Sequence, residues 1–482
     1  MKKLLIYFLF LAGIFAFAAC SEGVLDDSNE SINGGVGKQT VLGPITLKLE
    51  SVTGVTAQFS GSLDMSTVML YTEIGIIYST ESDLSQNSGT RVQIKTIINN
   101  NQFLETISPL PYNSEIYYAP YYCTATGLFV VGNINSFRTS DPYKCEQKGL
   151  SIDAAVNLSD VATANCYIVS QAGLYKFKTV KGNSNVSVGQ VASGEILWES
   201  FGTSTAPMRG ELINAFAYMN GYIVFKTSDS FRGGNAVIAA KDAKGKILWS
   251  WHIWFTEAPQ QQIYYDSRAT MMDRNLGAYT ATKGLVSSLG LLYQWGRKDP
   301  FLNASSISGR PVAQSTIEWP KHVMSDSKVG TMSYAIANPT TFIASENDAI
   351  DWLDVSDDSC WSSQKTIYDP CPVGWRVPDG GESGVWSAAA SLTKYTIDSS
   401  NMGMNFYNVF SSGYVWYPFA GELAASYGTL NVFGLSQGTY WSSTPSRELS
   451  YYFGIVNEYG WVHVNYEACR AYGFSVRCQK EW

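Results

Sequence analysis

The sequence predicts a mainly β protein with a C-terminal α+β domain, and three features of its composition point that way. Charged residues make up only 15% of the 482 residues, aromatic residues make up 14%, and there are 42 glycines. Low charge, many aromatic side chains and many glycines suit extended, turn-rich strands better than helix bundles. The hydrophobic share of 45% can form a sizeable core, which excludes a wholly disordered chain.

The length predicts how many domains the chain has, and its charge excludes one class of partner. At about 150 residues per domain, the length predicts about three domains. Lys and Arg total 33 against 41 Asp and Glu, which gives a net charge of −8. A nucleic-acid binder needs a basic surface to neutralise phosphates, so we expect no nucleic-acid partner.

The first twenty residues indicate export. Lys2 and Lys3 precede an apolar run over residues 4–17, and small residues then lead to Cys20. The run is shorter than the about 20 apolar residues of a membrane span, so residues 1–20 match a secretory signal peptide. Phe-Ala-Ala-Cys resembles a bacterial lipobox, which implies cleavage before Cys20, lipidation of that cysteine, and membrane contact through the lipid anchor only. An ordinary signal peptide followed by an incidental cysteine is the alternative.

Residues 21–41 predict a flexible acidic tether. Glu22, Asp26, Asp27 and Glu30 stand among Ser, Asn and Gly, a composition that stays solvated. Acidic residues just after a lipidated cysteine resemble the signal that sends lipoproteins of Bacteroides-like bacteria to the outer face. The resemblance implies an outer membrane lipoprotein exposed at the cell surface, and plain linker solubility is the alternative.

Residues 42–141 alternate like short strands separated by turns. Period-two runs start at Ile45, Gly75 and Arg91. Leu-Pro-Tyr-Asn-Ser-Glu-Ile-Tyr, ending at Tyr117, resembles the turn before strand F of a fibronectin type III-like β-sandwich, with Tyr117 as the corner tyrosine. A segment of about 100 residues is the usual size of one such sandwich, and such a module most often acts as a spacer or docking unit.

Residues 142–258 predict a second β-rich domain. The apolar runs 236–240 and 246–255 flank a polar turn that contains glycine, which is the signal of a β-hairpin. Both faces of the second run are apolar, so we expect a central buried strand. His252 on this strand is then expected to be a core histidine that makes hydrogen bonds, and a metal ligand is the alternative.

Residues 259–482 carry an ordered set of motifs. Asp369-Pro-Cys-Pro-Val-Gly-Trp-Arg-Val-Pro is followed by a predicted helix over 382–392, then by Tyr440-Trp-Ser-Ser-Thr-Pro and Ser475-Val-Arg-Cys; upstream lie Met272-Asp-Arg-Asn-Leu and Gly290-Leu-Leu-Tyr-Gln-Trp-Gly. The set resembles the Fibrobacter succinogenes major paralogous domain, which is related to the C-type lectin-like fold. The stretch 236–254 is similar to one that precedes this domain in fimbrial-tip and adhesin-like proteins.

The cysteines are expected to form disulfides, because disulfides persist in exported proteins. Seven cysteines follow Cys20, so at least one thiol stays free or pairs elsewhere. The resemblance implies a bridge between Cys371 and Cys478. We also expect a second bridge between Cys360 and Cys469 and a local one between Cys145 and Cys166.

Catalytic motifs are scarce, and we expect no enzyme. The only histidines, His252, His322 and His463, are too far apart for a metalloprotease helix. Gly434-Leu-Ser-Gln-Gly matches a nucleophile elbow by letters, but a strand-like run follows Ser436 where the elbow needs a helix. The fold also resembles formylglycine-generating enzymes, which use a close cysteine pair; the context of Cys469 and Cys478 favours structural bridges instead.

No metal or other cofactor is expected, and calcium is the alternative. The chain has an acidic cluster whose carboxylates could bind calcium, although such a run is more often a solvated face: Asp348, Asp351, Asp354, Asp357 and Asp358. The Glu-Pro-Asn motif of calcium-dependent lectins is absent, and Trp441-Ser-Ser stands where those lectins have Trp-Asn-Asp.

Binding is the function that the C-terminal strands favour. Aromatic rings beside polar groups suit stacking on sugars or anchoring a protein. The candidate ligand-binding residues are Tyr440, Trp441, Tyr459, Trp461, Tyr466 and Arg470. We expect a lipid-anchored adhesin or fimbria-associated subunit that recognises a surface glycan or a fimbrial or host protein. A polysaccharide-capturing lipoprotein of a nutrient-uptake system is the close alternative, followed by an enzyme of the formylglycine-generating type.

Overall fold

The structure is a computed structural model, and it divides the chain into two compact units. It describes residues 37, 39–98, 101–147, 149–264, 269–308, 311–319, 322–346, 351–390, 395–407, 413–431, 436–458 and 460–481. The first unit ends at Ser140, and the second contains residues 141–482 with the short stretch 53–55. The signal peptide, Cys20 and the tether up to residue 36 lie outside the described residues. Among the described helices, none has both the length and the apolar character of a membrane span.

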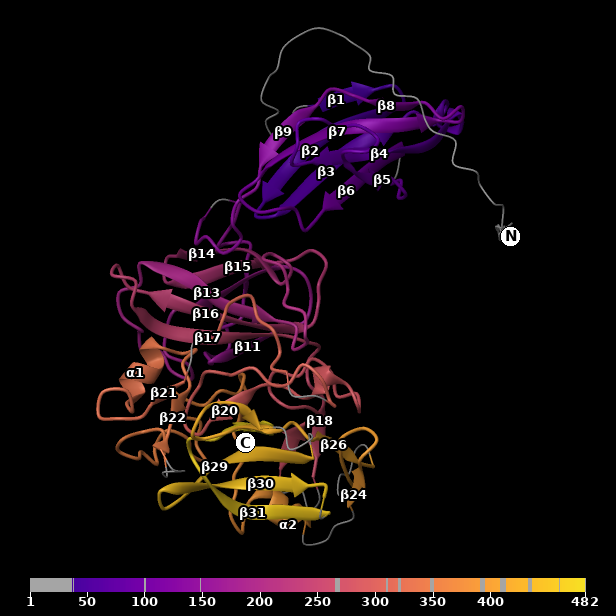
Figure 1. Cartoon of the computed structure of the whole chain (residues 1–482). Helices are drawn as coiled ribbons and strands as arrows, with labels where there is room; N and C mark the ends of the chain where they lie inside the picture. The colour runs from indigo at the N-terminus through magenta and orange to yellow at the C-terminus, as the bar shows by residue number, and fades with distance from the viewer. Residues whose placement is uncertain are drawn as a thin grey trace. The chain divides into compact units, whose positions relative to one another are not determined.

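The first unit is a two-sheet β-sandwich (Figure 1). Its first sheet has the order β1 (Gln39–Leu42), β2 (Ile45–Thr53), β3 (Thr56–Leu63), β6 (Gln102–Ile107). Its second sheet has the order β5 (Thr90–Gln93), β4 (Tyr71–Ser79), β7 (Glu115–Thr124), β8 (Phe129–Val131), and β9 (Asn135–Arg138) also pairs with β7. This arrangement confirms the sandwich expected for this segment.

The interior of the sandwich corrects one detail of the prediction. Phe59 of the first sheet lies 5.0 Å from Tyr118 of the second, measured between ring centroids, and Tyr118 is only 1% exposed. Because side chains alternate along a strand, Tyr117 lies on the other face of β7, where it packs with Tyr121 and Phe129. Tyr117 therefore lies outside the core between the sheets, and among the described residues its hydroxyl lacks the backbone hydrogen bond that defines a corner tyrosine.

The second unit begins with two four-stranded sheets. One has the order β10 (Val156–Asn157), β12 (Leu174–Lys178), β15 (Tyr222–Thr227), β14 (Ile213–Met219). The other has the order β11 (Cys166–Val169), β17 (Ile247–Phe255), β16 (Gly234–Lys241), β13 (Ser193–Ser200). The predicted hairpin is present, because β16 and β17 pair antiparallel around a turn in which Gly245 has a φ of +81°.

β17 is a buried central strand, as its sequence predicts. Trp249 and Trp251 face the core between the two sheets, whereas Trp254 faces a second core shared with residues from the C-terminal part of the unit. His252 is 2% exposed, and its Nε2 is 2.8 Å from Asn235 Oδ1. Burial lowers the pKa of His252 to about 3, so the ring is neutral and structural.

The remaining strands of the second unit form smaller sheets around one larger sheet. The larger sheet has the order β28 (Leu430–Asn431), β27 (Glu422–Leu423), β32 (Gly473–Ser475), β29 (Gln437–Ser446), β30 (Leu449–Val456), β31 (Trp461–Cys469), and β20 (Leu292–Gln294) pairs with β32. One smaller sheet has the order β18 (Gln261–Ile263), β19 (Thr270–Met272), β33 (Gln479–Lys480), β23 (Trp375–Arg376). Another has the order β24 (Tyr395–Asp398), β25 (Gly403–Phe406), β26 (Val415–Pro418), and a third pairs β21 (Val323–Met324) with β22 (Ile343–Ala344).

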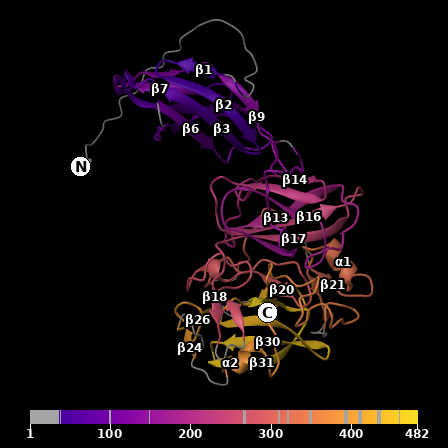
Figure 2. The same cartoon turned by 180° about the vertical axis from the view of Figure 1, so that it is seen from behind.

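Two short helices complete the described part of this unit, α1 (Met332–Ala337) and α2 (Val385–Ala390). The second lies within the predicted range 382–392 and packs against β31. Both views of the molecule place α2 beside β31 at the end of the unit formed by β29, β30 and β31 (Figures 1 and 2). The mainly β class is confirmed, and the likeness of this part to a C-type lectin-like fold stays a prediction.

Candidate functional site

Two of the predicted ligand-binding residues lie in the core. Tyr440 and Trp441 are adjacent on β29, and both are 0% exposed. The Tyr440 hydroxyl donates to the Pro418 carbonyl, and the Trp441 ring stacks on Phe474 at 4.3 Å between centroids. Because β29 has a strand on each side and is covered on both faces, neither ring can touch a ligand. Their prediction as ligand-binding residues is wrong.

Arg470 is also buried, and it holds the end of β31 in place. Its guanidinium is 0% exposed, lies 3.4 Å from Asp351 and 2.5 Å from Asp358, and covers the Trp295 ring at 4.3 Å. An arginine with its donors used in this way is structural, which corrects its prediction as a ligand contact.

The same contacts bear on the calcium alternative. Burial raises the pKa of Asp351, and Arg470 acts against that shift by favouring the carboxylate. Asp351 and Asp358 therefore already have a cationic partner, and Asp348 lies outside the described residues. Across the described ranges, the acidic, histidine and cysteine side chains form no group that could hold a metal ion.

The remaining predicted residues come together on the outer face of β31. Trp461 and Tyr466 are each 54% exposed, and His463 lies between them. The ring centroids of Trp461 and His463 are 5.8 Å apart, and those of His463 and Tyr466 are 4.7 Å apart. We call Trp461, His463 and Tyr466 the aromatic strip. Tyr459, the other predicted residue, lies outside the described residues.

The neighbouring strand and a bulge explain why these three rings share one face. Trp461 pairs with Val456, His463 with Gly454 and Tyr466 with Tyr452, and the register shifts between the last two pairs. The extra residue at this bulge reverses the alternation of side chains, and Tyr466 therefore lies on the same face as Trp461 and His463. Val462 and Val464 face the opposite way and pack on the core with Trp386 of α2.

Sequence reasoning missed His463 as a member of the strip. The alternation from Trp461 to Val464 is a signal that could have found it, because it places His463 beside Trp461. The bulge that adds Tyr466 to the same face has no signal in the sequence, since it depends on how β30 and β31 pair.

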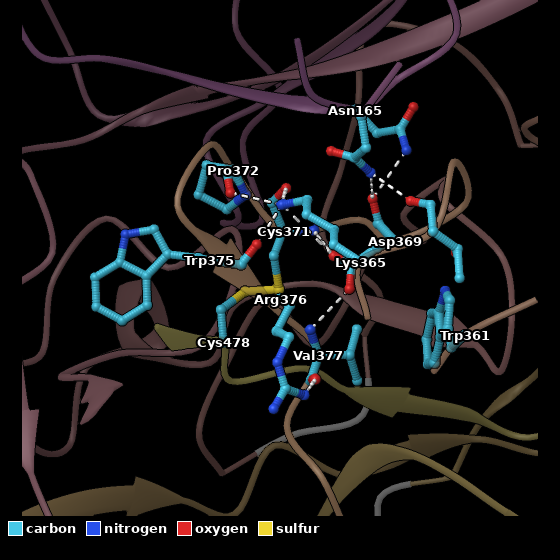
Figure 3. Close-up of polar contacts among 12 residues, drawn as sticks. Asn165, Trp361, Lys365, Asp369, Cys371, Pro372, Trp375, Arg376, Val377 and Cys478 are labelled. Atoms are coloured by element: carbon cyan, nitrogen blue, oxygen red, sulfur yellow. Dashed lines mark hydrogen bonds and ion pairs between the residues drawn. A yellow bond between two sulfur atoms is a disulfide. The ribbon is translucent and has the colours of Figure 1, made fainter. Parts of the chain in front are cut away.

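The motif around Cys371 is a structural junction. Cys371 and Cys478 form the expected disulfide. Nearby, the Lys365 ammonium donates to the carbonyl oxygens of Cys371, at 2.8 Å, and of Pro372, at 2.7 Å (Figure 3). Asp369 accepts hydrogen bonds from the backbone amides of Cys371 and Val377, at 2.8 and 2.9 Å.

This junction ties the two parts of the second unit together. The amide Nδ2 of Asn165, which lies just before β11, donates to the Asp369 carbonyl at 2.8 Å (Figure 3). Burial raises the pKa of Asp369 and lowers that of Lys365. Because the polar groups of the motif are used within the fold, it stabilises the unit and offers no reactive group.

The second predicted disulfide is not formed. Cys360 carries a free thiol, so it is not bonded to Cys469. Its side chain packs directly on Gly296, where a Cβ atom would come within 2.7 Å of the Cys360 Cβ. Burial raises the pKa of the Cys360 thiol, which disfavours the reactive thiolate. The local bridge between Cys145 and Cys166 is likewise absent, because both carry free thiols.

Comparisons with known proteins leave the family open. No family model matches the chain, and no curated protein matches it. Among solved structures, the chain is similar to the chicken CNTN1 FN1–FN3 domains, with 12% identity, coverage of 47% of this chain and 74% of that one, and a TM-score of 0.15. HBP35 of Porphyromonas gingivalis is 11% identical, with coverage of 44% of this chain and 63% of that one, and a TM-score of 0.18.

A Bacteroides ovatus protein, SGBP-B of a mixed-linkage glucan utilization locus in complex with a heptasaccharide, gives 13% identity, coverage of 45% of each chain and a TM-score of 0.13. The chain spans 63% of HBP35 and 45% of SGBP-B. Similarities at TM-scores this low carry no functional argument. The function therefore has to be inferred from the side chains.

Proposed function

We propose that this chain is a lipid-anchored cell-surface protein that binds carbohydrate through the aromatic strip. The observation that carries the proposal is the exposure of Trp461 and Tyr466, each 54%, in one row on the last strand of a sheet. Aromatic rings in such a row offer flat apolar faces to the C–H faces of sugar rings.

The anchor and the role in adhesion belong to this proposal. The lipobox-like sequence before Cys20 and the acidic tether support an outer membrane lipoprotein, and a sandwich unit ahead of the second unit suits a spacer. Adhesin or fimbria-associated subunit is the role we favour, and a polysaccharide-capturing lipoprotein would use the same strip. For the enzyme alternative, the disulfide of Cys478 with Cys371 removes one thiol of the cysteine pair that it needs.

A glycan array tests the proposal. The soluble chain starting at Glu22 is applied to plant, microbial and host glycans, with and without a chelator. We expect binding that the chelator leaves unchanged and that Trp461→Ala weakens at least about tenfold, the size of effect seen when an anchoring aromatic ring is truncated. Tyr112→Ala, which removes a 47% exposed ring from the first unit, is the matched control and should bind normally.

The outcomes separate the alternatives. Binding that survives both Trp461→Ala and Tyr466→Ala would show that the strip is not the site. A chain that binds no glycan would instead favour a protein partner, and loss of binding with the chelator would favour the calcium alternative.

A further inference from the structure

A cavity of about 530 Å³ lies in the second unit, away from the residues of the strip. Its deep wall is apolar and nearly inaccessible: Phe301, Leu302, Ala313, Phe342 and Leu423, all 3–5% exposed. The volume falls within the range of about 300–1,000 Å³ that is usual for small-ligand sites.

Aromatic rings form much of the wall and the rim. The Trp319 ring lies 6.1 Å from Phe301, and Phe301 lies 5.4 Å from Phe342, all between centroids. At the rim, Tyr427 is 63% exposed and its ring contacts His322 at 5.9 Å. The aromatic surface that a ring-shaped ligand can reach is therefore that of Trp319 and Tyr427, with Phe301 and Phe342 packed behind it.

Polar side chains line the same cavity. Gln314, Glu318, His322 and Thr340 all contribute to its lining. Among the described residues, none of these four side chains has a hydrogen-bond partner, so their donors and acceptors are available to a ligand.

The segment 311–319, which carries Gln314 and Glu318, is held in place before any ligand arrives. The backbone amides of Gln314 and Thr316 donate to the carbonyls of Thr203 and Glu199, at 2.9 and 3.1 Å. The Thr316 hydroxyl accepts from the Glu199 amide at 3.0 Å. A site fixed in this way loses less conformational freedom on binding, which favours affinity.

We propose that this cavity, the aromatic pocket, is a second carbohydrate site that takes one uncharged sugar ring. A pyranose has apolar C–H faces, which match the aromatic wall, and hydroxyl edges, which match the four available polar groups. A purely apolar ligand would cover those groups without replacing their bonds to water, which is unfavourable. The Glu318 carboxylate disfavours an acidic sugar by repulsion.

The proposal rests on carbohydrate as the ligand class, but it shares no residue with the strip. Trp461, His463 and Tyr466 do not line the pocket. The two sites can therefore be tested independently in one chain.

Methyl glycosides of glucose, galactose and mannose are the probes, with indole as an apolar probe, and binding to the chain starting at Glu22 is followed by ligand-observed NMR. Val312→Trp fills the pocket from its rim, where Val312 is 44% exposed and an added ring needs no room in the core. We expect at least one glycoside to bind, Val312→Trp to weaken it at least about tenfold, and Trp461→Ala to change it less than twofold.

Tyr427→Ala only removes atoms from the rim, so it serves as the second variant if Val312→Trp misfolds. It should also weaken binding of the glycoside. The proposal is overturned if no glycoside binds, if binding is unchanged in both pocket variants, or if indole alone binds. If the pocket test fails in one of these ways but Trp461→Ala abolishes polysaccharide binding, the proposed function stands and only the proposal of a second site is refuted.

Discussion

Two strands of one sheet, β29 and β31, carry aromatic pairs that look alike in the sequence and have opposite environments. Tyr440 and Trp441 on β29 are 0% exposed, whereas Trp461 and Tyr466 on β31 are 54% exposed. β29 lies between β32 and β30, and β31 is the last strand of the sheet. The position of a strand in its sheet, more than its own residues, decides whether an aromatic ring stabilises the core or is available to a ligand.

The two strands even share a face. Trp441 pairs with Tyr452 of β30, and Tyr452 pairs with Tyr466 of β31, so these rings lie on the same side of the sheet. At β29 this side is buried in the cluster that also contains Trp295 and Phe474, and at β31 it is open to solvent. One continuous face therefore passes from core to surface within three strands.

The largest expected effect comes from replacing each of the two tryptophans by alanine and comparing the losses of stability. Trp441→Ala should lower the free energy of unfolding by about 3–5 kcal/mol, because a large buried ring leaves a cavity. Trp461→Ala should change it by less than about 0.5 kcal/mol, as is usual for exposed positions. Urea unfolding of both variants measures the difference. Equal destabilisation by both variants would contradict the contrast between the two strands.

A second expected effect concerns Arg470, which directly follows β31 and is buried. Arg470→Met should lower the free energy of unfolding by about 2–4 kcal/mol, because it leaves the Asp351 carboxylate buried without its cation. The value is below that of a fully buried pair, since the other partner, Asp358, is 61% exposed. The double variant Arg470→Met, Asp351→Asn should regain part of the loss, and Lys244→Met, at an exposed site, is the control.

Additional destabilisation in that double variant would show that Asp351 stabilises the fold through groups other than Arg470. The measurement is again urea unfolding at neutral pH. Together with the tryptophan variants, it would show that β31 is surface at its start and core at its end.

Local patterns predicted the parts of this protein that depend on neighbours in the sequence. Alternation and the glycine-bearing turn identified β16, β17 and the hairpin between them, and the apolar character of both faces identified β17 as central. The bridge between Cys371 and Cys478 came from resemblance to a family, and residue chemistry alone would not have chosen that pairing.

The errors about Arg470 and Trp441 depend on distant contacts. Arg470 is buried by Asp351, which is 119 residues away, and the indole of Trp441 donates to the Tyr293 carbonyl, 148 residues away. The aromatic pocket combines Phe301 with Tyr427, which no local pattern connects. A sequence shows which side chains are present, but burial follows from how separate segments pack, and this information is not local.

The smallest of the expected effects lies near the opposite end of the same sheet, in β27. Glu422 is 8% exposed, accepts from Asn431 at 3.3 Å, and has its pKa raised to about 7 by burial. A carboxyl that binds its proton more tightly in the folded state stabilises the fold fully below its unfolded pKa, near 4.5, and this stabilisation is lost as the pH rises through about 7.

We therefore expect the free energy of unfolding to fall by about 1–3 kcal/mol between pH 5 and pH 8 because of this group. Glu199, whose pKa burial raises to about 8, acts in the same direction, so the comparison has to be made between the wild type and Glu422→Gln. Urea midpoints at pH 5, 6, 7 and 8 should fall less steeply in the variant. Parallel curves would mean that water reaches Glu422, and that this end of the sheet is as open as the face that carries Trp461.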